Sequence, residues 1–407
     1  MMLRISWFNM IRKWFFVFSL LLALTFPAAA GEPIIIPDIS SYTVGAAFAG
    51  PTRQGFDMAE EEINAAGGVL GRPIKFEHID DIGDPGAAVT KLEQIILKEK
   101  PILFTGCNLA TIERAFSAYA KKNKILQISS CTNGDQVVLK DGHDYMFRGA
   151  GPLTYGINMG MAERAAQKRK LKWAAINHNY AWGQENLAGF KENLHSYLPQ
   201  ASWVAEHWVT VGKINAGSIV NAVMKSGANA IYTSLWGSDL SQFLREAKKR
   251  GLTEKVLIVG EGIGRPYFMK VIKGEMPLGV VTVGILPYED PVTPKMKAFA
   301  QKYQEKYHQS VRYAAMSAYM TATSIVAAIE KAGAVDTEKV AAALKGLKFD
   351  SIYGPITVRA IDNVPDNGMW VGETALKNGQ PILVNVKYLD GKDYFPSDEY
   401  IKKLRAK

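Results

Sequence analysis

Residues 55–78, GFDMAEEEINAAGGVLGRPIKFEH, hold a helix, a tight turn and a strand within one short stretch. Gly55–Asn64 has the apolar spacing of an amphipathic helix, and Ala65–Gly68 ends it in a turn. Pro73–His78 then reads as a strand. A helix that leads straight into a strand is the unit of a sheet with crossover helices, so this stretch predicts an α/β fold.

The same alternation continues along the chain. Strands are expected at 102–105, 125–128, 173–176, 202–208, 228–233 and 255–259. Helices are expected at 87–98, 111–121, 153–168, 183–195, 216–226, 239–250 and 314–332. The pattern restarts after Pro152 and becomes strand-rich after Gly354. We therefore expect two doubly wound units that pack closely, since no long flexible linker separates them.

The composition excludes two broad classes. The chain has 407 residues, of which 48% are hydrophobic and 21% charged, so it can bury a large core and is not disordered. The formal net charge of +9 is modest for this length, and the basic residues are scattered. Nucleic-acid binding is therefore not indicated.

The first 30 residues predict an export signal. A basic beginning is followed by Trp14–Phe26, an apolar run of 13 residues, and then by Ala28–Ala30 as a cleavage site. The run is shorter than the roughly 20 residues that a membrane-spanning helix needs. We expect cleavage after Ala30, with Gly31 as the first residue of an exported, soluble protein.

Ligands of open parallel sheets bind beyond the carboxyl ends of the strands, so the segments there are the candidate site. Thr111 and Thr132 follow first-half strands and either cap helices or hold a carboxylate. Trp182 and Trp236 follow second-half strands and either pack in the core or contact a ligand. Glu261 lies between two glycines, where an acid rarely serves packing, which favours a role in binding.

The two cysteines of the sequence are also placed at strand ends. Cys107 and Cys131 follow successive predicted strands, so they can emerge side by side. They form either a disulfide, as an oxidising compartment permits, or two buried thiols.

No enzyme motif appears. The six histidines are far apart, without metal-binding spacing, and no nucleophile elbow or phosphate-binding loop is present. The glycines around Glu261 lack the spacing of a dinucleotide site. We therefore expect no catalytic residues, no metal and no cofactor.

The chain resembles the periplasmic Leu/Ile/Val-binding protein family, the solute-binding components of ABC importers. The helix and turn of residues 55–73 are similar to the family's "G…AxEEINAxGGxxGxxI" pattern. Further motifs occur in the family's order, and they are Asp80–Pro85, Phe147-Arg148, Tyr180–Gly183, Glu261-Gly262 and Tyr353–Ile356. The resemblance covers essentially the whole chain after residue 30.

The resemblance implies two Rossmann-like lobes with parallel central sheets, joined by three crossing segments and closing on a ligand in the cleft between them. The crossings would lie near Gly149–Pro152, Ile285–Pro287 and Tyr353–Val358. The N-terminal lobe would then comprise residues 31–149 and 288–354, and the C-terminal lobe residues 150–287 and 355–407.

The resemblance also implies where an amino acid would bind. The positions that match the family's carboxylate and ammonium contacts are Ala110, Thr111, Cys131, Thr132 and Glu261, and those that match its aromatic contacts are Tyr42 or Phe48, Tyr180 and Trp236. The expected protein is a periplasmic monomer that carries a small carboxylate-bearing solute, such as a hydrophobic amino acid, to an ABC permease in the inner membrane. A protein for an aromatic acid, an amide or a urea-like solute, and a ligand-sensing receptor component, remain alternatives.

Overall fold

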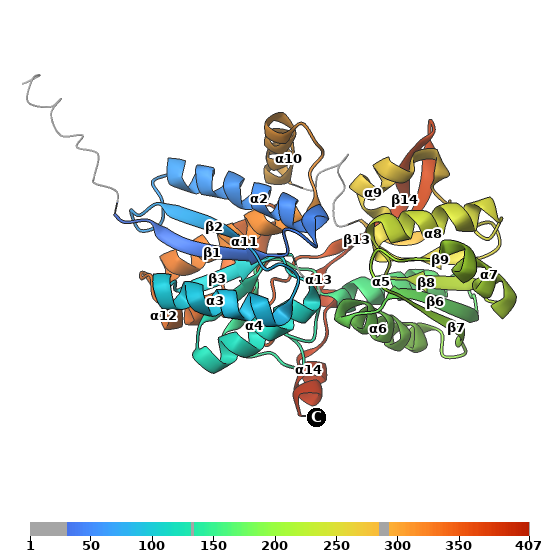
Figure 1. Ribbon diagram of the computed structural model, residues 1–407, viewed down its shortest axis with the longest axis horizontal. Helices are drawn as coiled ribbons and strands as arrows, with labels where there is room; N and C mark the ends of the chain where they lie inside the picture. The colour runs from blue at the N-terminus through green and yellow to red at the C-terminus, as the bar shows by residue number, and fades with distance from the viewer. Residues whose placement is uncertain (1–30, 132–133, 285–292, 407) are drawn as a thin grey trace, which may run out of the picture.

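The computed structural model describes residues 31–131, 134–284 and 293–406. The predicted signal peptide, Thr132 and the predicted second crossing lie outside the described residues. Within the described ranges, no helix has both the length and the apolar composition needed to span a membrane. Figure 1 shows two lobes side by side, the first containing the blue and orange elements and the second the green and yellow ones.

The first lobe is built on a five-stranded sheet with the order β2-β1-β3-β4-β5, in which all paired strands are parallel. Its strands are β1 (Ile34–Ser40), β2 (Ile74–Asp80), β3 (Leu103–Gly106), β4 (Leu126–Ser129) and β5 (Met146–Arg148). Its helices are α2 (Ala46–Ala65), α3 (Pro85–Glu99), α4 (Ala110–Asn123), α10 (Pro294–Tyr307), α11 (Tyr313–Ala332) and α12 (Thr337–Leu344).

An apolar core lies on each face of the first-lobe sheet. On one face, β1 and β2 pack with α2, α11 and α12 through buried residues such as Ile36, Phe56 and Ile325. On the other face, Phe104 and Phe116 join the sheet to α3 and α4. Helices on both faces are what a parallel sheet requires.

The second lobe has a seven-stranded sheet with the order β14-β13-β10-β9-β8-β6-β7. Five strands are parallel, and they are β6 (Lys172–His178), β7 (Ser202–Val209), β8 (Ala230–Thr233), β9 (Leu257–Val259) and β10 (Val281–Gly284). The hairpin β13 (Met369–Lys377) and β14 (Gln380–Leu389) adds an antiparallel edge. The expected two-lobed α/β architecture with parallel sheets is confirmed.

Helices again cover both faces of this sheet. α5 (Thr154–Ala166) and α6 (Ala181–Tyr197) share one core with Trp173 and Tyr232. α7 (Ala216–Ser226), α8 (Gly237–Lys249) and the short α9 (Pro266–Ile272) share another core with Ile176 and Ile258. The 3₁₀ turns η1 (Glu261–Gly264) and η2 (Lys273–Glu275) flank α9, while α13 (Gly391–Tyr394) and α14 (Asp398–Arg405) follow the hairpin.

Residues of the predicted third crossing, Tyr353–Val358, contact the first lobe. β12 (Gly354–Thr357) forms a hairpin with β11 (Lys348–Ser351), and Val358 is buried in the core beneath the first sheet. The chain reaches the second sheet only at Met369. Ile356 packs beside Ala150 and Met320, and Val358 packs beneath the first sheet. The chain therefore stays beside the first lobe at least as far as Val358.

Candidate functional site

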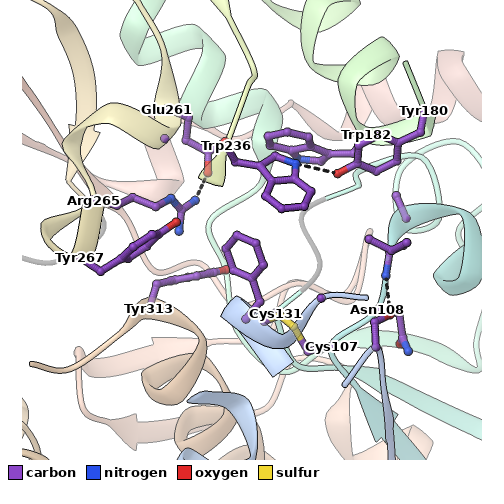
Figure 2. A pocket seen from close by; sticks show the side chains of 16 residues that line it. Cys107, Asn108, Cys131, Tyr180, Trp182, Trp236, Glu261, Arg265, Tyr267 and Tyr313 are labelled. Carbon is purple, nitrogen blue, oxygen red and sulfur yellow. Dashed lines mark hydrogen bonds and ion pairs between the residues drawn. A yellow bond between two sulfur atoms is a disulfide. The ribbon is translucent and has the colours of Figure 1, made fainter. Parts of the chain in front are cut away.

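A cavity of about 90 Å³ lies between the two lobes, beyond the carboxyl ends of their strands. Figure 2 shows it from close by, with side chains of both lobes around it. The first lobe contributes Ser41, Gly45, Phe48, Cys107, Asn108, Leu109, Ala110, Cys131 and Tyr313. The second lobe contributes Tyr180, Trp182, Trp236, Glu261, Gly262, Arg265 and Tyr267.

Aromatic rings form the second-lobe wall of the cavity. Trp236 Nε1 donates a hydrogen bond of 3.3 Å to the Tyr180 hydroxyl, and Trp182 lies beside Tyr180 at a ring distance of 6.2 Å. Phe48, from α2 of the first lobe, meets the Trp236 ring edge-on at 5.6 Å. Burial raises the pKa of Tyr180 well above its ordinary value, so this wall is neutral and suits an apolar group.

Three helices begin at the cavity, and no side chain among the described residues caps any of them. α4 begins after Leu109, α6 after Tyr180 and α8 after Trp236, and all three of these residues line the cavity. The first amides of a helix have no partner within the helix and carry the positive end of its dipole. The cavity therefore offers backbone N–H groups to an anion such as a carboxylate.

A buried ion pair forms the charged part of the site. Residues 261–264 form the turn η1, which places Glu261 and Arg265 side by side so that Arg265 donates to Glu261 Oε1. The guanidinium also lies over the Tyr313 ring at 5.0 Å, across the boundary between the lobes. Burial alone would lower the pKa of Arg265, but Glu261 together with the neighbouring Tyr267 and Tyr313 raises the pKa, so Arg265 is charged.

The second carboxylate oxygen of Glu261 has no hydrogen-bond donor among the described residues. This oxygen, Oε2, is buried. A buried acceptor without a donor costs about 1–3 kcal/mol. This oxygen can therefore accept a hydrogen bond from a ligand that enters the cavity.

The first-lobe floor of the cavity contains the disulfide between Cys107 and Cys131. The structure thus settles the open alternative in favour of a bond, with a Cα–Cα distance of 4.9 Å. Next to it, Asn108 donates to the Ile39 carbonyl at 2.7 Å and to Asp81 Oδ2 at 2.8 Å. These bonds fix the turn from which α4 begins.

No group of three or more potential metal-binding side chains is found in the part of the chain that the structure describes. What the cavity offers is one free carboxylate oxygen, an arginine, open helix amides and a ring of aromatic side chains. This set can bind a small organic ion through its charged groups and enclose its apolar part.

Comparison with known proteins identifies the family to which this chain belongs. The model of the periplasmic binding protein family matches residues 35–380. The chain belongs to this family. It is a periplasmic solute-binding protein of the ABC-transporter type, not an enzyme, and the resemblance noted in the sequence is confirmed.

The relatives of this binding protein differ in what they bind. The leucine-, isoleucine-, valine-, threonine- and alanine-binding protein of Pseudomonas aeruginosa is 26% identical over 74% of this chain and 79% of its own length. Two solved structures are 19% identical and share the fold. A Rhodopseudomonas palustris solute-binding protein in complex with 3,4-dihydroxybenzoic acid has a TM-score of 0.78 and covers 88% of this chain and 98% of its own. A Brucella ovis protein named for the same five amino acids has a TM-score of 0.77 and covers 90% and 97%.

The structure brings most of the predicted site residues of the binding protein together. The cavity is lined by Phe48, Ala110, Cys131, Tyr180, Trp182, Trp236 and Glu261. Thr111 is exposed and does not line the cavity. Tyr42 does not line it either, because its hydroxyl donates to Asp38 and lies 3.0 Å from His78 Nδ1, within the first lobe.

Sequence reasoning missed three large side chains of the cavity, Arg265, Tyr267 and Tyr313. The four-residue spacing between Glu261 and Arg265 was a usable signal, since a helical turn places such residues side by side. Tyr313 begins α11, and nothing local indicates that the start of this helix reaches a cavity formed mainly by strand ends.

Proposed function

We propose that this binding protein captures a small amino acid with an apolar side chain between its lobes and delivers it to an ABC permease in the inner membrane. In the same proposal the chain is exported by the signal peptide and cleaved after Ala30. The observation that carries the choice of ligand is the buried, unpartnered Oε2 of Glu261.

An ammonium group is the donor that best fits this oxygen. Arg265 occupies Oε1 of the same carboxylate, so one hydrogen-bond acceptor is left for the ligand. The open amides of α4 lie on the first-lobe side of the cavity, where a carboxylate would be stabilised. A zwitterion satisfies both positions at once, and its side chain would lie against Trp236, Tyr180 and Trp182.

A second candidate is an aromatic carboxylate. Arg265 is a permanent cation in a cavity lined by rings, and arginine binds carboxylates through paired hydrogen bonds. Such a ligand has no ammonium, and its carboxylate would compete with Glu261 for Arg265. The two candidates therefore respond differently to the loss of the Glu261 charge.

The substitution Glu261→Gln separates them. With an amino acid, the variant should lose about 2–5 kcal/mol of binding free energy, the range for truncating a buried charge pair. With benzoate, the variant should bind equally well or more tightly, because a repelling carboxylate is removed. Titration calorimetry of L-leucine, L-phenylalanine and benzoate measures both.

Glu254→Gln is the matched control, because Glu254 is an exposed acid of the same lobe outside the cavity. It should bind each ligand as the unaltered protein does. An amino acid that binds equally well to the unaltered protein and to Glu261→Gln would refute the role given to Glu261.

A further inference from the structure

The disulfide of this protein lies in the wall of the ligand cavity. Cys107 follows β3 and Cys131 follows β4, and both side chains line the cavity. In Figure 2 the disulfide lies on the first-lobe side, opposite Glu261 and Trp236. It therefore joins two neighbouring turns at the place where the ligand carboxylate is proposed to bind.

The turn that carries Cys107 is firmly anchored to β1 and its end. The Cys107 amide donates to Ser40 Oγ at 2.8 Å, and its carbonyl accepts from the Ser41 amide at 3.1 Å. The Leu109 amide donates to Ser41 Oγ at 3.2 Å. These bonds fix the chain immediately before the first amides of α4.

The turn after β4 is tied to this anchored turn at two points. The Ser130 amide donates to the Gly106 carbonyl at 2.9 Å, and one residue later the disulfide holds Cys131.

We propose that the Cys107–Cys131 disulfide is a positioning element of the ligand site. It holds the turn after β4 beside the start of α4 before the ligand arrives, so the cost of ordering this wall does not reduce the binding energy. The inference rests on the proposed function for the identity of the ligand. Ligand affinity should depend on the disulfide, whereas the folded state of the protein should not.

The fold should persist without the bond because the two strands are held independently. β3 and β4 are paired from Leu103↔Leu126 to Gly106↔Ser129, and Phe104, Leu126 and Ile128 are buried in the cores of the first lobe. Replacing both sulfurs leaves these contacts in place. The double variant Cys107→Ala/Cys131→Ala is thus expected to remain folded at 15 °C.

The test compares the oxidised protein with the double variant by titration calorimetry at 15 °C, with L-leucine, L-phenylalanine and benzoate as probes. A probe that binds the oxidised protein should bind the double variant at least about tenfold more weakly. Dithiothreitol should produce the same loss in the unaltered protein, as it reduces the bond to two thiols and is itself oxidised to its cyclic disulfide. The reductant should leave the double variant unchanged, which makes that variant the matched control.

A second measurement needs no ligand. Hydrogen exchange of the peptide covering residues 126–131 should become at least about tenfold faster after reduction, while the anchored residues 107–112 and the second lobe stay unchanged. Exchange that is the same in both forms would overturn the proposal, even if no probe binds and the proposed ligand class fails. Equal affinity of oxidised and reduced protein for a probe, accompanied only by a lower melting temperature, would also overturn it.

Discussion

His78 lies between two carboxylates that favour its ionised form. Its Nδ1 lies 2.7 Å from Asp38 Oδ2, and its Nε2 lies 3.0 Å from Asp57 Oδ1. Burial alone would lower the pKa of His78, but these two carboxylates outweigh it and raise the pKa to about 9. The imidazolium is therefore the form that holds β1, β2 and α2 together, and Tyr42 belongs to this cluster.

This arrangement predicts a pH-dependent stability. The raised pKa means that His78 contributes its full stabilisation below its unfolded pKa of about 6.5 and loses it as the pH rises through 9. His78→Gln should therefore cost about 3 kcal/mol of unfolding free energy at pH 6 and much less at pH 10. Urea denaturation at both values measures the difference, with His195→Gln, an exposed histidine of α6, as control. A cost that is the same at both pH values would contradict the ionised pair.

A single residue could be assigned to the binding site from the sequence only where its residue type was unusual for its position. Glu261 was found because an acid between glycines at a strand end has few packing roles, and the structure places it in the cavity. Tyr42 lies away from the cavity because its partners, Asp38 of β1 and His78 of β2, hold it within the first lobe, and His78 in turn contacts Asp57 of α2. No local pattern shows that these side chains meet.

At the scale of elements, α2 and α11 pack closely against each other at Gly55. A Cβ added at Gly55 would lie 2.0 Å from the carbonyl oxygen of Ala315, so the absence of a side chain lets the helices approach. This contact joins a helix that precedes the second lobe in sequence to one that follows most of it.

Gly55→Ala should accordingly destabilise the protein by about 1–3 kcal/mol, because the two helices must move apart. Gly50→Ala is the matched control in the same helix, where an added Cβ would have no neighbour within 4 Å. That control should be neutral or up to about 1 kcal/mol more stable, since alanine favours a helix. Thermal or urea unfolding of both variants decides, and equal stability of the two would contradict the close packing.

The elements themselves were largely predictable, and the exceptions have physical causes. α7 has the bounds that its apolar spacing predicts. α2 begins at Ala46, before the predicted Gly55, because it continues through Pro51, a residue that usually marks a helix end. β1 was not identified, since Pro37 and Asp38 interrupt its apolar run.

For the whole molecule, the decisive feature is that the cavity belongs to both lobes. The open amides of α4 come from the first lobe and Glu261 from the second, so a ligand that uses both favours the closed arrangement. Each lobe is assembled from segments that are far apart in the sequence, because the chain crosses between the lobes three times. Composition and periodicity do not reveal these crossings.

Ligand binding should therefore make the molecule more compact. We expect small-angle scattering to give a smaller radius of gyration with saturating amino acid than without it. At a ligand concentration of one hundred times the Kd, the unfolding free energy should rise by about 2.7 kcal/mol. A radius of gyration that does not change at saturation would contradict closure by the ligand.

The position of α11 in the chain has a consequence for synthesis. This helix completes the core beneath the first sheet, yet it is translated after all five parallel strands of the second lobe. The second sheet in turn lacks β13 and β14 until the final part of the chain is made. During synthesis, neither lobe therefore has all its elements until the last part of the chain has been made. The lobes cannot complete their folding one after the other, as the domains of many proteins do.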